Sequence, residues 1–197
     1  NGDARTNTSL LGDTLVRVGL SHNLEALFGW TAFGYERARD RASGQVEKAS
    51  RIGDGLIGFK ANMREPDGSG FSAAVQAYVT VPLGRTPIGA GDWGGGVIVP
   101  VTFDLSPSLN LQFAPEVQAA VDEDGRGRHL AYGGVVGLEV DLSDALNVTF
   151  ELAATRDKDP ASRTTQSFGA VSLGWMAAHD FRLDLGATLG LNHAAPD

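Results

Sequence analysis

The sequence of 197 residues contains no cysteine, and its 16 lysines and arginines are outnumbered by 24 aspartates and glutamates. The missing cysteine excludes a disulfide framework, a thiolate zinc site and a cysteine nucleophile. The formal net charge of −8 opposes binding to nucleic acid, which needs a basic surface, so we expect no nucleic-acid partner. No window reaches 18 uninterrupted apolar residues, so the sequence predicts no membrane-spanning helix.

Helical spacing of apolar residues is almost absent too, and alternation with a period of two replaces it. Between residues 109 and 121 every odd position is apolar, whereas the even positions include Asn110, Gln112, Glu116 and Gln118. This alternation is typical of a strand with one apolar and one polar face. The same pattern predicts ten strands, at residues 9–20, 24–36, 53–64, 71–83, 95–105, 109–122, 130–142, 146–155, 166–178 and 181–192.

The connections between these strands alternate in length. Short turns follow the first, third, fifth, seventh and ninth strands, and longer polar loops follow the others, at residues 37–52, 84–94, 123–129 and 156–165. Successive antiparallel strands would place all short turns at one end of the sheet and all long loops at the other. A Leu-Ser pair recurs in three of the short turns, at Ser21, Ser106 and Ser143, and turn chemistry explains it.

Strand length, strand number and the sorted loops together favour a membrane barrel over a soluble sandwich. A tilted membrane-spanning strand needs about 9 to 11 residues, and an even number of strands lets the first and last pair. Short turns on one side and long loops on the other are typical of outer-membrane barrels. We therefore predict an all-β fold, an antiparallel up-and-down transmembrane β-barrel of about ten visible strands, forming one domain over residues 1–197.

The polar face then lines the lumen and the apolar face contacts lipid. No formal charge occupies the middle of the apolar face in any predicted strand, as a lipid contact requires. Trp30 and Trp175 fall on this face, as do Phe28, Phe103, Phe113, Phe150 and Phe181. The charged residues that alternation places in the lumen are Arg17, Glu25, Lys60, Glu116, Glu139, Glu151, Arg182 and Asp184.

A search for catalytic and metal-binding patterns is negative. The four histidines lie in or beside connections and read as surface residues, and none pairs with another at metal-ligand spacing. His129 falls at the long-loop rim, but no serine is placed beside it by the sequence. Residues 122–125 offer carboxylates but lack the other spaced ligands of a calcium loop, so they read as a turn. We expect no enzyme, no metal and no cofactor.

Two stretches carry a resemblance to a known family. The alternating hairpins, the Leu-Ser turns and Trp93 before three glycines resemble Gram-negative outer-membrane β-barrel proteins. More narrowly, residues 53–60, followed by residues 78–84 and by Trp93, resemble the transporters assigned to the meta-pathway of phenol degradation. The resemblance implies an outer-membrane location, insertion by the barrel-assembly machinery and an aromatic or other hydrophobic solute. Such barrels usually end in an aromatic residue, and this chain ends in Asp197, so we expect a trimmed form of a barrel of about twelve strands.

The sequence therefore predicts an outer-membrane channel for passive passage of small solutes through a polar, mildly acidic lumen, with the lipid bilayer as its surroundings. Two alternatives stay open. One is a non-conducting structural or adhesive barrel whose charged side chains plug the interior. The other is a soluble β-barrel carrier of hydrophobic ligands, with the apolar face turned inward.

Overall fold

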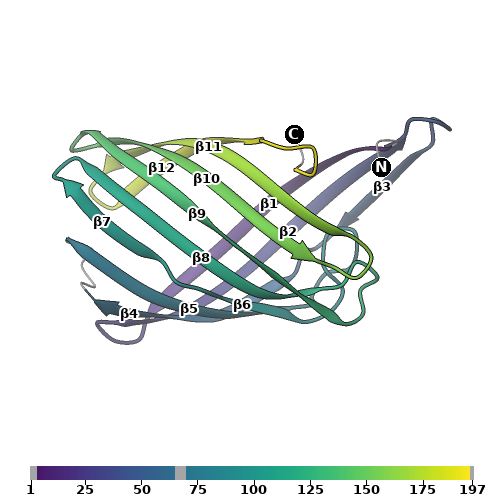
Figure 1. The fold of residues 1–197 in the computed structure, drawn as a ribbon, viewed down its shortest axis with the longest axis horizontal. Coiled ribbons are helices and arrows are strands. Elements are labelled where there is room, and N and C mark those ends of the chain that lie inside the picture. The colour runs from purple at the N-terminus through teal and green to yellow at the C-terminus, as the bar shows by residue number, and fades with distance from the viewer. Residues whose placement is uncertain (1–3, 65–69, 196–197) are drawn as a thin grey trace.

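The computed structural model describes residues 4–64 and 70–195, and its regular structure there is entirely β (Figure 1). Twelve antiparallel strands form one sheet. They are β1 (Ala4–Gly19), β2 (Leu24–Asp40), β3 (Val46–Arg51), β4 (Gly55–Arg64), β5 (Phe71–Val81), β6 (Gly94–Ile98), β7 (Val101–Ser106), β8 (Leu109–Val121), β9 (Arg128–Ser143), β10 (Leu146–Lys158), β11 (Arg163–Ala178) and β12 (Phe181–Gly190). The described residues contain no helix that is long and apolar enough to cross a membrane.

The strands follow one another around the sheet in chain order, which is the predicted up-and-down topology. The path runs β1-β2-β4-β5-β6-β8-β9-β10-β11-β12, and β7 lies between β5 and β8 like β6. These ten positions correspond to the ten predicted strands. The all-β antiparallel class is therefore confirmed, and the alternation of apolar and polar residues was sufficient to identify it.

The predicted strand at residues 95–105 is wrong as a continuous element, because Val99 and Pro100 separate β6 from β7. The N–H of Val99 donates to the carbonyl of Pro115 on β8 at 3.0 Å. Pro100, which follows Val99, therefore lies at the same level of the ladder as Pro115. Neither proline has an N–H to donate, and two missing donors at one level interrupt the pairing. The strand resumes at Val101, where β7 pairs with β5 and β8.

The predicted loop at residues 37–52 is also corrected, because it contains β3. Pairs from Gly34 with Arg51 to Arg39 with Val46 join β3 to the second half of β2. The first half of β2, from Leu24 to Trp30, pairs with β4 instead. The hairpin of β1, β2 and β3 therefore projects beyond the rest of the sheet, at the upper right of Figure 1.

The short turns lie at one end of the sheet and the long loops at the other, as predicted (Figure 1). In the three Leu-Ser turns, the serine Oγ accepts a backbone N–H two residues further on, at 3.5 Å from Asn23 and 3.3 Å from Ser108 and Ala145. This side-chain bond explains the recurring serine. The predicted turn at residues 65–70 lies mostly outside the described residues.

The sheet curls into an open barrel, and the expected pairing of the first and last strands is not found among the described residues. β1 pairs with β2 alone along its whole length, and β2 turns away from β4 after Trp30. The part of the first hairpin beyond Trp30 consequently extends past β4 (Figure 1). At the other edge, every residue from Phe181 to Leu189 is exposed, because β12 has a neighbour on one side only.

Candidate functional site

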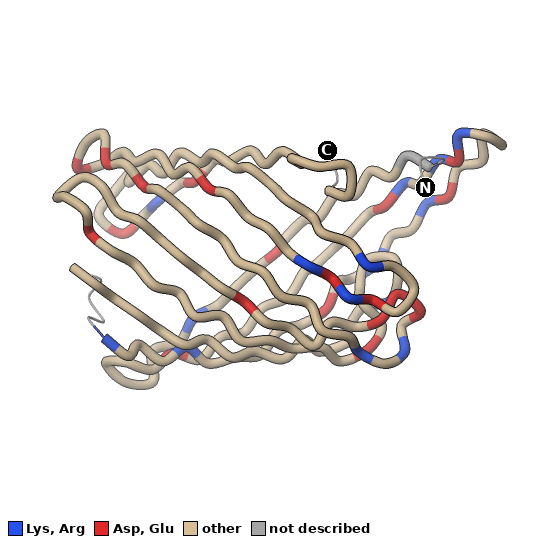
Figure 2. Tube along the Cα trace, in the orientation of Figure 1, with Lys and Arg blue, Asp and Glu red and all other residues tan. Residues whose placement is uncertain are grey.

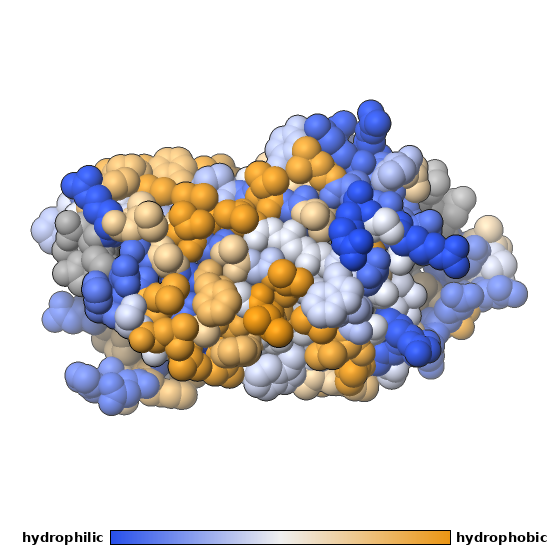
Figure 3. Space-filling model, turned by 90° about the horizontal axis from the view of Figure 1, so that it is seen from below, coloured by the Kyte–Doolittle hydropathy of each residue, from blue (hydrophilic) through white to orange (hydrophobic). Residues whose placement is uncertain are grey.

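The two faces of the curled sheet differ in exposure, and the difference is the reverse of that in a soluble protein. Large apolar side chains on the convex face are exposed, and their exposed fractions reach from 36% for Phe113 to 76% for Leu185. The polar residues between them are mostly half-buried, as in β8, where Gln112, Glu116 and Gln118 are less exposed than Val117. Figure 3 shows apolar side chains along the middle of one outer face and hydrophilic ones toward its ends.

The aromatic residues predicted on the apolar face all lie exposed. They are Phe28, Trp30, Phe103, Phe113, Phe150, Trp175 and Phe181. No central core of apolar side chains replaces them, because the largest fully buried side chain among the described residues is Leu27 alone. The soluble arrangement, with the apolar face packed inward, is therefore not the one that this fold adopts.

Strand register aligns the side chains of the concave face in continuous rows, in which polar residues predominate. Glu25 pairs with Lys60, Lys60 with Gln76, Gln76 with Ile98, and Ile98 with Glu116. Residues directly opposite one another in an antiparallel ladder project from the same face. The row thus carries side chains from β2, β4, β5 and β8 to one level of the interior.

The structure places five of the eight predicted lumen residues half-buried on the concave face: Glu25, Lys60, Glu116, Glu139 and Glu151. The other three lie on the two edge strands and are exposed: Arg17, Arg182 and Asp184. The Arg182 guanidinium donates to Asp184 at 2.9 Å and to the side-chain oxygen of Asn147 at 3.1 Å, which links β12 to β10 across β11. The eight residues do not form one cluster but occupy several levels.

Sequence reasoning missed Tyr78, whose hydroxyl donates a hydrogen bond to Glu116 Oε1. Tyr78 pairs with Gly96, and a Cβ on Gly96 would lie 2.8 Å from the tyrosine hydroxyl, so the ring occupies the space that this glycine leaves. Glu116 itself pairs with Gly133 on β9. The period-two pattern could have found Tyr78, since it shares its face with Gln76 and Thr80.

Leu27 is the second interior residue that sequence reasoning missed, because it is apolar and yet lies on the polar face. It pairs with Arg17 on one side and with Gly58 on the other, and its exposed fraction is 0%. Gly58 in turn pairs with Tyr78. The interior is thus filled by side chains at the level of Leu27 and Tyr78, next to the row that contains Glu116.

At the long-loop rim, three aspartates surround His129. Its Nδ1 lies 2.8 Å from Asp122 Oδ1 and 3.5 Å from Asp159 Oδ2, and its Nε2 lies 2.8 Å from Asp157 Oδ1. The expectation of a surface histidine is wrong for His129, whose side chain is 6% exposed. β9 begins at Arg128, one residue earlier, and this places His129 on the concave face. The turn expected at residues 122–125 is present and closes with Gly125 N–H on the Asp122 carbonyl at 2.8 Å.

The electrostatics of this rim cluster favour the charged states of His129 and Asp159. Burial lowers the pKa of His129, but the hydrogen bond with Asp122 and the charges of Asp157 and Asp159 outweigh it and raise that pKa above its usual value. The backbone N–H of Ala161 lowers the pKa of Asp159, with further help from the N–H of Glu123 and from His129, against a smaller effect of burial.

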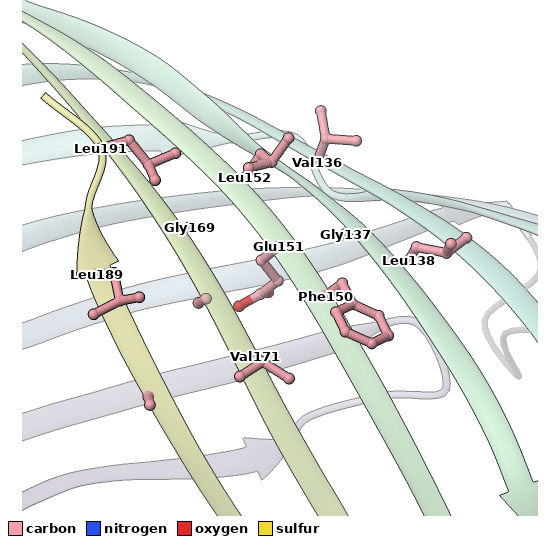
Figure 4. Close-up of a pocket in the computed structure, with 12 residues that line it drawn as sticks. Val136, Gly137, Leu138, Phe150, Glu151, Leu152, Gly169, Val171, Leu189 and Leu191 are labelled. Carbon is pink, nitrogen blue, oxygen red and sulfur yellow. The ribbon is translucent and has the colours of Figure 1, made fainter.

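An apolar groove of about 530 Å³ crosses the convex face over β9, β10, β11 and β12 (Figure 4). Gly169 lies within it and carries no side chain, so Phe150, Leu152, Val171 and Leu189 stand around an open space. All four of these side chains project from the outer face. The groove extends the exposed apolar surface rather than the polar interior.

A comparison with models of known protein families gives a match. The family model described as "Putative MetA-pathway of phenol degradation" matches residues 3–197. No curated protein matches the chain.

Proposed function

We propose that this chain, which belongs to the family described as "Putative MetA-pathway of phenol degradation", is an outer-membrane channel through which small solutes pass passively. The family description names a pathway of phenol degradation, and this supports small aromatic compounds as the solute class. On this proposal the chain is a transporter rather than an enzyme. Its surroundings are the lipid bilayer, and the barrel-assembly machinery inserts it.

The observation that carries the proposal is the reversed exposure of the two faces. Exposed leucine, valine and phenylalanine side chains around a whole sheet would be costly in water, at about 25 cal/mol per Å² of apolar surface. In hydrocarbon the same surface is favourable, and a barrel needs such an apolar band facing lipid. The polar residues on the concave face then supply the hydrated interior of a channel.

The charge of the interior predicts a preference among solutes. The eight lumen residues contain three basic and five acidic side chains, which leaves a net charge of about −2. Carboxylates that line a pore attract cations and repel anions at close range. We therefore expect the channel to admit neutral and cationic small solutes more readily than anions.

Recording single channels in a planar lipid bilayer tests the proposal. Wild-type protein, shown to be folded, should give conductance steps and a reversal potential that favours cations in a salt gradient. Glu116→Gln combined with Glu151→Gln should shift the reversal potential toward zero, because two interior charges are lost. Glu47→Gln, on β3 in the projecting hairpin, is the matched control and should leave the reversal potential unchanged. Folded protein without conductance would contradict the proposal.

A second candidate, a barrel that does not conduct, is favoured by the filled level at Leu27 and by the bond between Tyr78 and Glu116. In that case the interior polar side chains stabilise the fold instead of lining a path. Glu116→Ala would then lower the stability of the folded protein more than it changes permeation. Equilibrium unfolding and bilayer recording on the same variant separate the two candidates.

A further inference from the structure

We propose that Asp122, His129 and Asp159 bind a divalent transition-metal cation of the Zn²⁺ type at the long-loop rim. One atom from each of these residues lies within 4.8 Å of the others. The site is independent of the channel proposal, because it lies beyond the rows of polar side chains that would line the path. Two of the three ligands lie in connections, Asp122 directly after β8 and Asp159 between β10 and β11, and His129 lies at the start of β9.

The distances from His129 Nδ1 to the two carboxylate oxygens fit one small cation. Ligands about 2.1 Å from a tetrahedral Zn²⁺ lie about 3.4 Å from one another. His129 Nδ1 lies 2.8 Å from Asp122 Oδ1 and 3.5 Å from Asp159 Oδ2, on either side of that value. An aqueous ligand would complete four-coordination.

The other nitrogen of the imidazole points to a ligand as well. His129 Nε2 is buried and makes no hydrogen bond of acceptable geometry within the described residues, although it lies 2.8 Å from Asp157 Oδ1. A metal on Nδ1 would fix the ring proton on Nε2, next to that carboxylate. A carboxylate that accepts from the far nitrogen of a metal-bound histidine is the usual outer partner at such sites. Asp157 would therefore orient His129 rather than bind the metal.

The charge balance of the cluster also calls for a cation. Three carboxylates surround one imidazole, and within the described part of the chain their ion pairs are with His129 only. Two basic side chains adjacent to the cluster in sequence are engaged elsewhere: Arg128 pairs with Asp92 at 3.1 Å, and Lys158 lies over the ring of Tyr132. Close carboxylates repel one another unless a positive charge lies between them.

The donor set selects the class of metal. One imidazole nitrogen with two carboxylate oxygens suits Zn²⁺ or a neighbouring transition metal, whereas Ca²⁺ takes six to eight oxygen ligands. Bound there, the metal would join the two loops that already meet where the Glu123 N–H donates to Asp159 Oδ2 at 2.7 Å. The site would thus clamp the long-loop rim.

Calorimetric titration of Zn²⁺ into chelator-stripped protein, folded in detergent micelles, tests the site. We expect one Zn²⁺ per chain, at least a tenfold loss of affinity in Asp122→Asn and His129→Gln, and about a 10- to 100-fold loss in Asp157→Asn. His179→Gln is the matched control, because His179 also pairs with an aspartate, at 2.7 Å from Asp180, but is 96% exposed. This variant should bind as wild type does.

X-ray absorption of the zinc-loaded wild-type protein keeps the test independent of variant folding. We expect one imidazole nitrogen and carboxylate oxygens at about 2.0 to 2.2 Å from the metal. Absence of a stoichiometric site in wild type, an absorption spectrum without imidazole, or undiminished binding by folded His129→Gln would each overturn the proposal. Titration with Ca²⁺ should give no binding of comparable affinity.

Discussion

Adjacent residues of β8 show how finely the two faces are separated. Val117 is 53% exposed, whereas Gln118 beside it is half-buried. Val117 pairs with Val97 and Tyr132 on the outer face, and Gln118 pairs with Gly96 and Ala131 on the inner face. Two consecutive residues of β8 therefore face different surroundings, the proposed lipid for Val117 and the proposed aqueous interior for Gln118.

A lysine placed at each of these two positions should have different effects on stability. Val117→Lys puts a charge near the middle of the proposed lipid face, which costs about 2 to 4 kcal/mol. Gln118→Lys puts the same charge in the polar interior and should cost less than about 1 kcal/mol. Denaturant titration of both variants refolded into lipid vesicles measures the two values. Equal effects of the two substitutions would contradict the assignment of the faces.

Asp40 at the tip of the projecting hairpin supports a prediction about pH. Its carboxylate accepts the N–H groups of Ala42 at 2.8 Å and Ser43 at 2.7 Å, and the bonds with Ser43 come first among the causes that lower its pKa from 3.8. A lowered pKa means that the turn is fully stabilised above pH 3.8 and loses this stabilisation as pH falls through the lower value.

Hydrogen exchange measures the effect of Asp40 directly. The amides of Ala42 and Ser43 should lose their protection as the carboxylate is protonated, after allowance for intrinsic exchange rates. Asp40→Ala should abolish that protection at every pH, while Asp40→Asn keeps one oxygen acceptor and should preserve part of it. Protection that does not change between pH 5 and pH 2 would show that the carboxylate does not hold the turn.

Among the strands, β9 depends most on its glycines. A Cβ on Gly133 would lie 2.1 Å from the carbonyl oxygen of Ala154, a backbone atom that cannot move without disturbing the pairing of β9 with β10. A Cβ on Gly137, on the same face and strand, would meet its nearest neighbours at 3.6 Å. Because Gly133 has no side chain, it also leaves room beside Glu116, its partner on β8.

Gly133→Ala should therefore destabilise the protein by about 1 to 3 kcal/mol through overpacking. Gly137→Ala should be close to neutral, because it makes only ordinary contacts. Equilibrium unfolding of the two variants under identical conditions gives the comparison. A Gly137→Ala variant that proved the less stable of the two would show that the local geometry of β9 is wrong.

The elements also show how far the sequence alone could be used. β8, β10 and β11 were predictable because one apolar and one polar face give a strict period of two. β3 was not, since its alternation is weak and its pairing depends on the extension of β2 beyond β4. The break between β6 and β7 at Pro100 depends on Pro115, which lies on β8. A pattern within one strand cannot predict that two prolines from different strands lie side by side.

The rim cluster could not be predicted for a related reason. Asp122, His129 and Asp159 are separated along the chain and come together only because β8, β9 and β10 lie side by side. For the polar interior, the sequence predicted charged residues but neither Tyr78, which binds Glu116, nor Leu27, which fills the adjacent level. Their roles depend on Gly96 and Gly58 across the ladder.

Over the whole molecule, charge and apolar surface are arranged along the barrel axis. Charged residues gather toward the ends of the sheet and are sparse in the strand middles (Figure 2). Apolar side chains occupy the middle of the outer surface between them (Figure 3). This distribution matches a barrel whose central band contacts hydrocarbon and whose two ends contact water.

A cysteine scan of β8 in lipid bilayers tests the orientation of the faces most directly, because the natural chain has no cysteine to interfere. Spin labels at positions 111, 113, 117 and 119 should be accessible to oxygen dissolved in the lipid. Labels at 112, 116 and 118 should be accessible instead to a water-soluble nickel chelate. Accessibility without a period of two, or with the two sets exchanged, would contradict an apolar exterior around a hydrated interior.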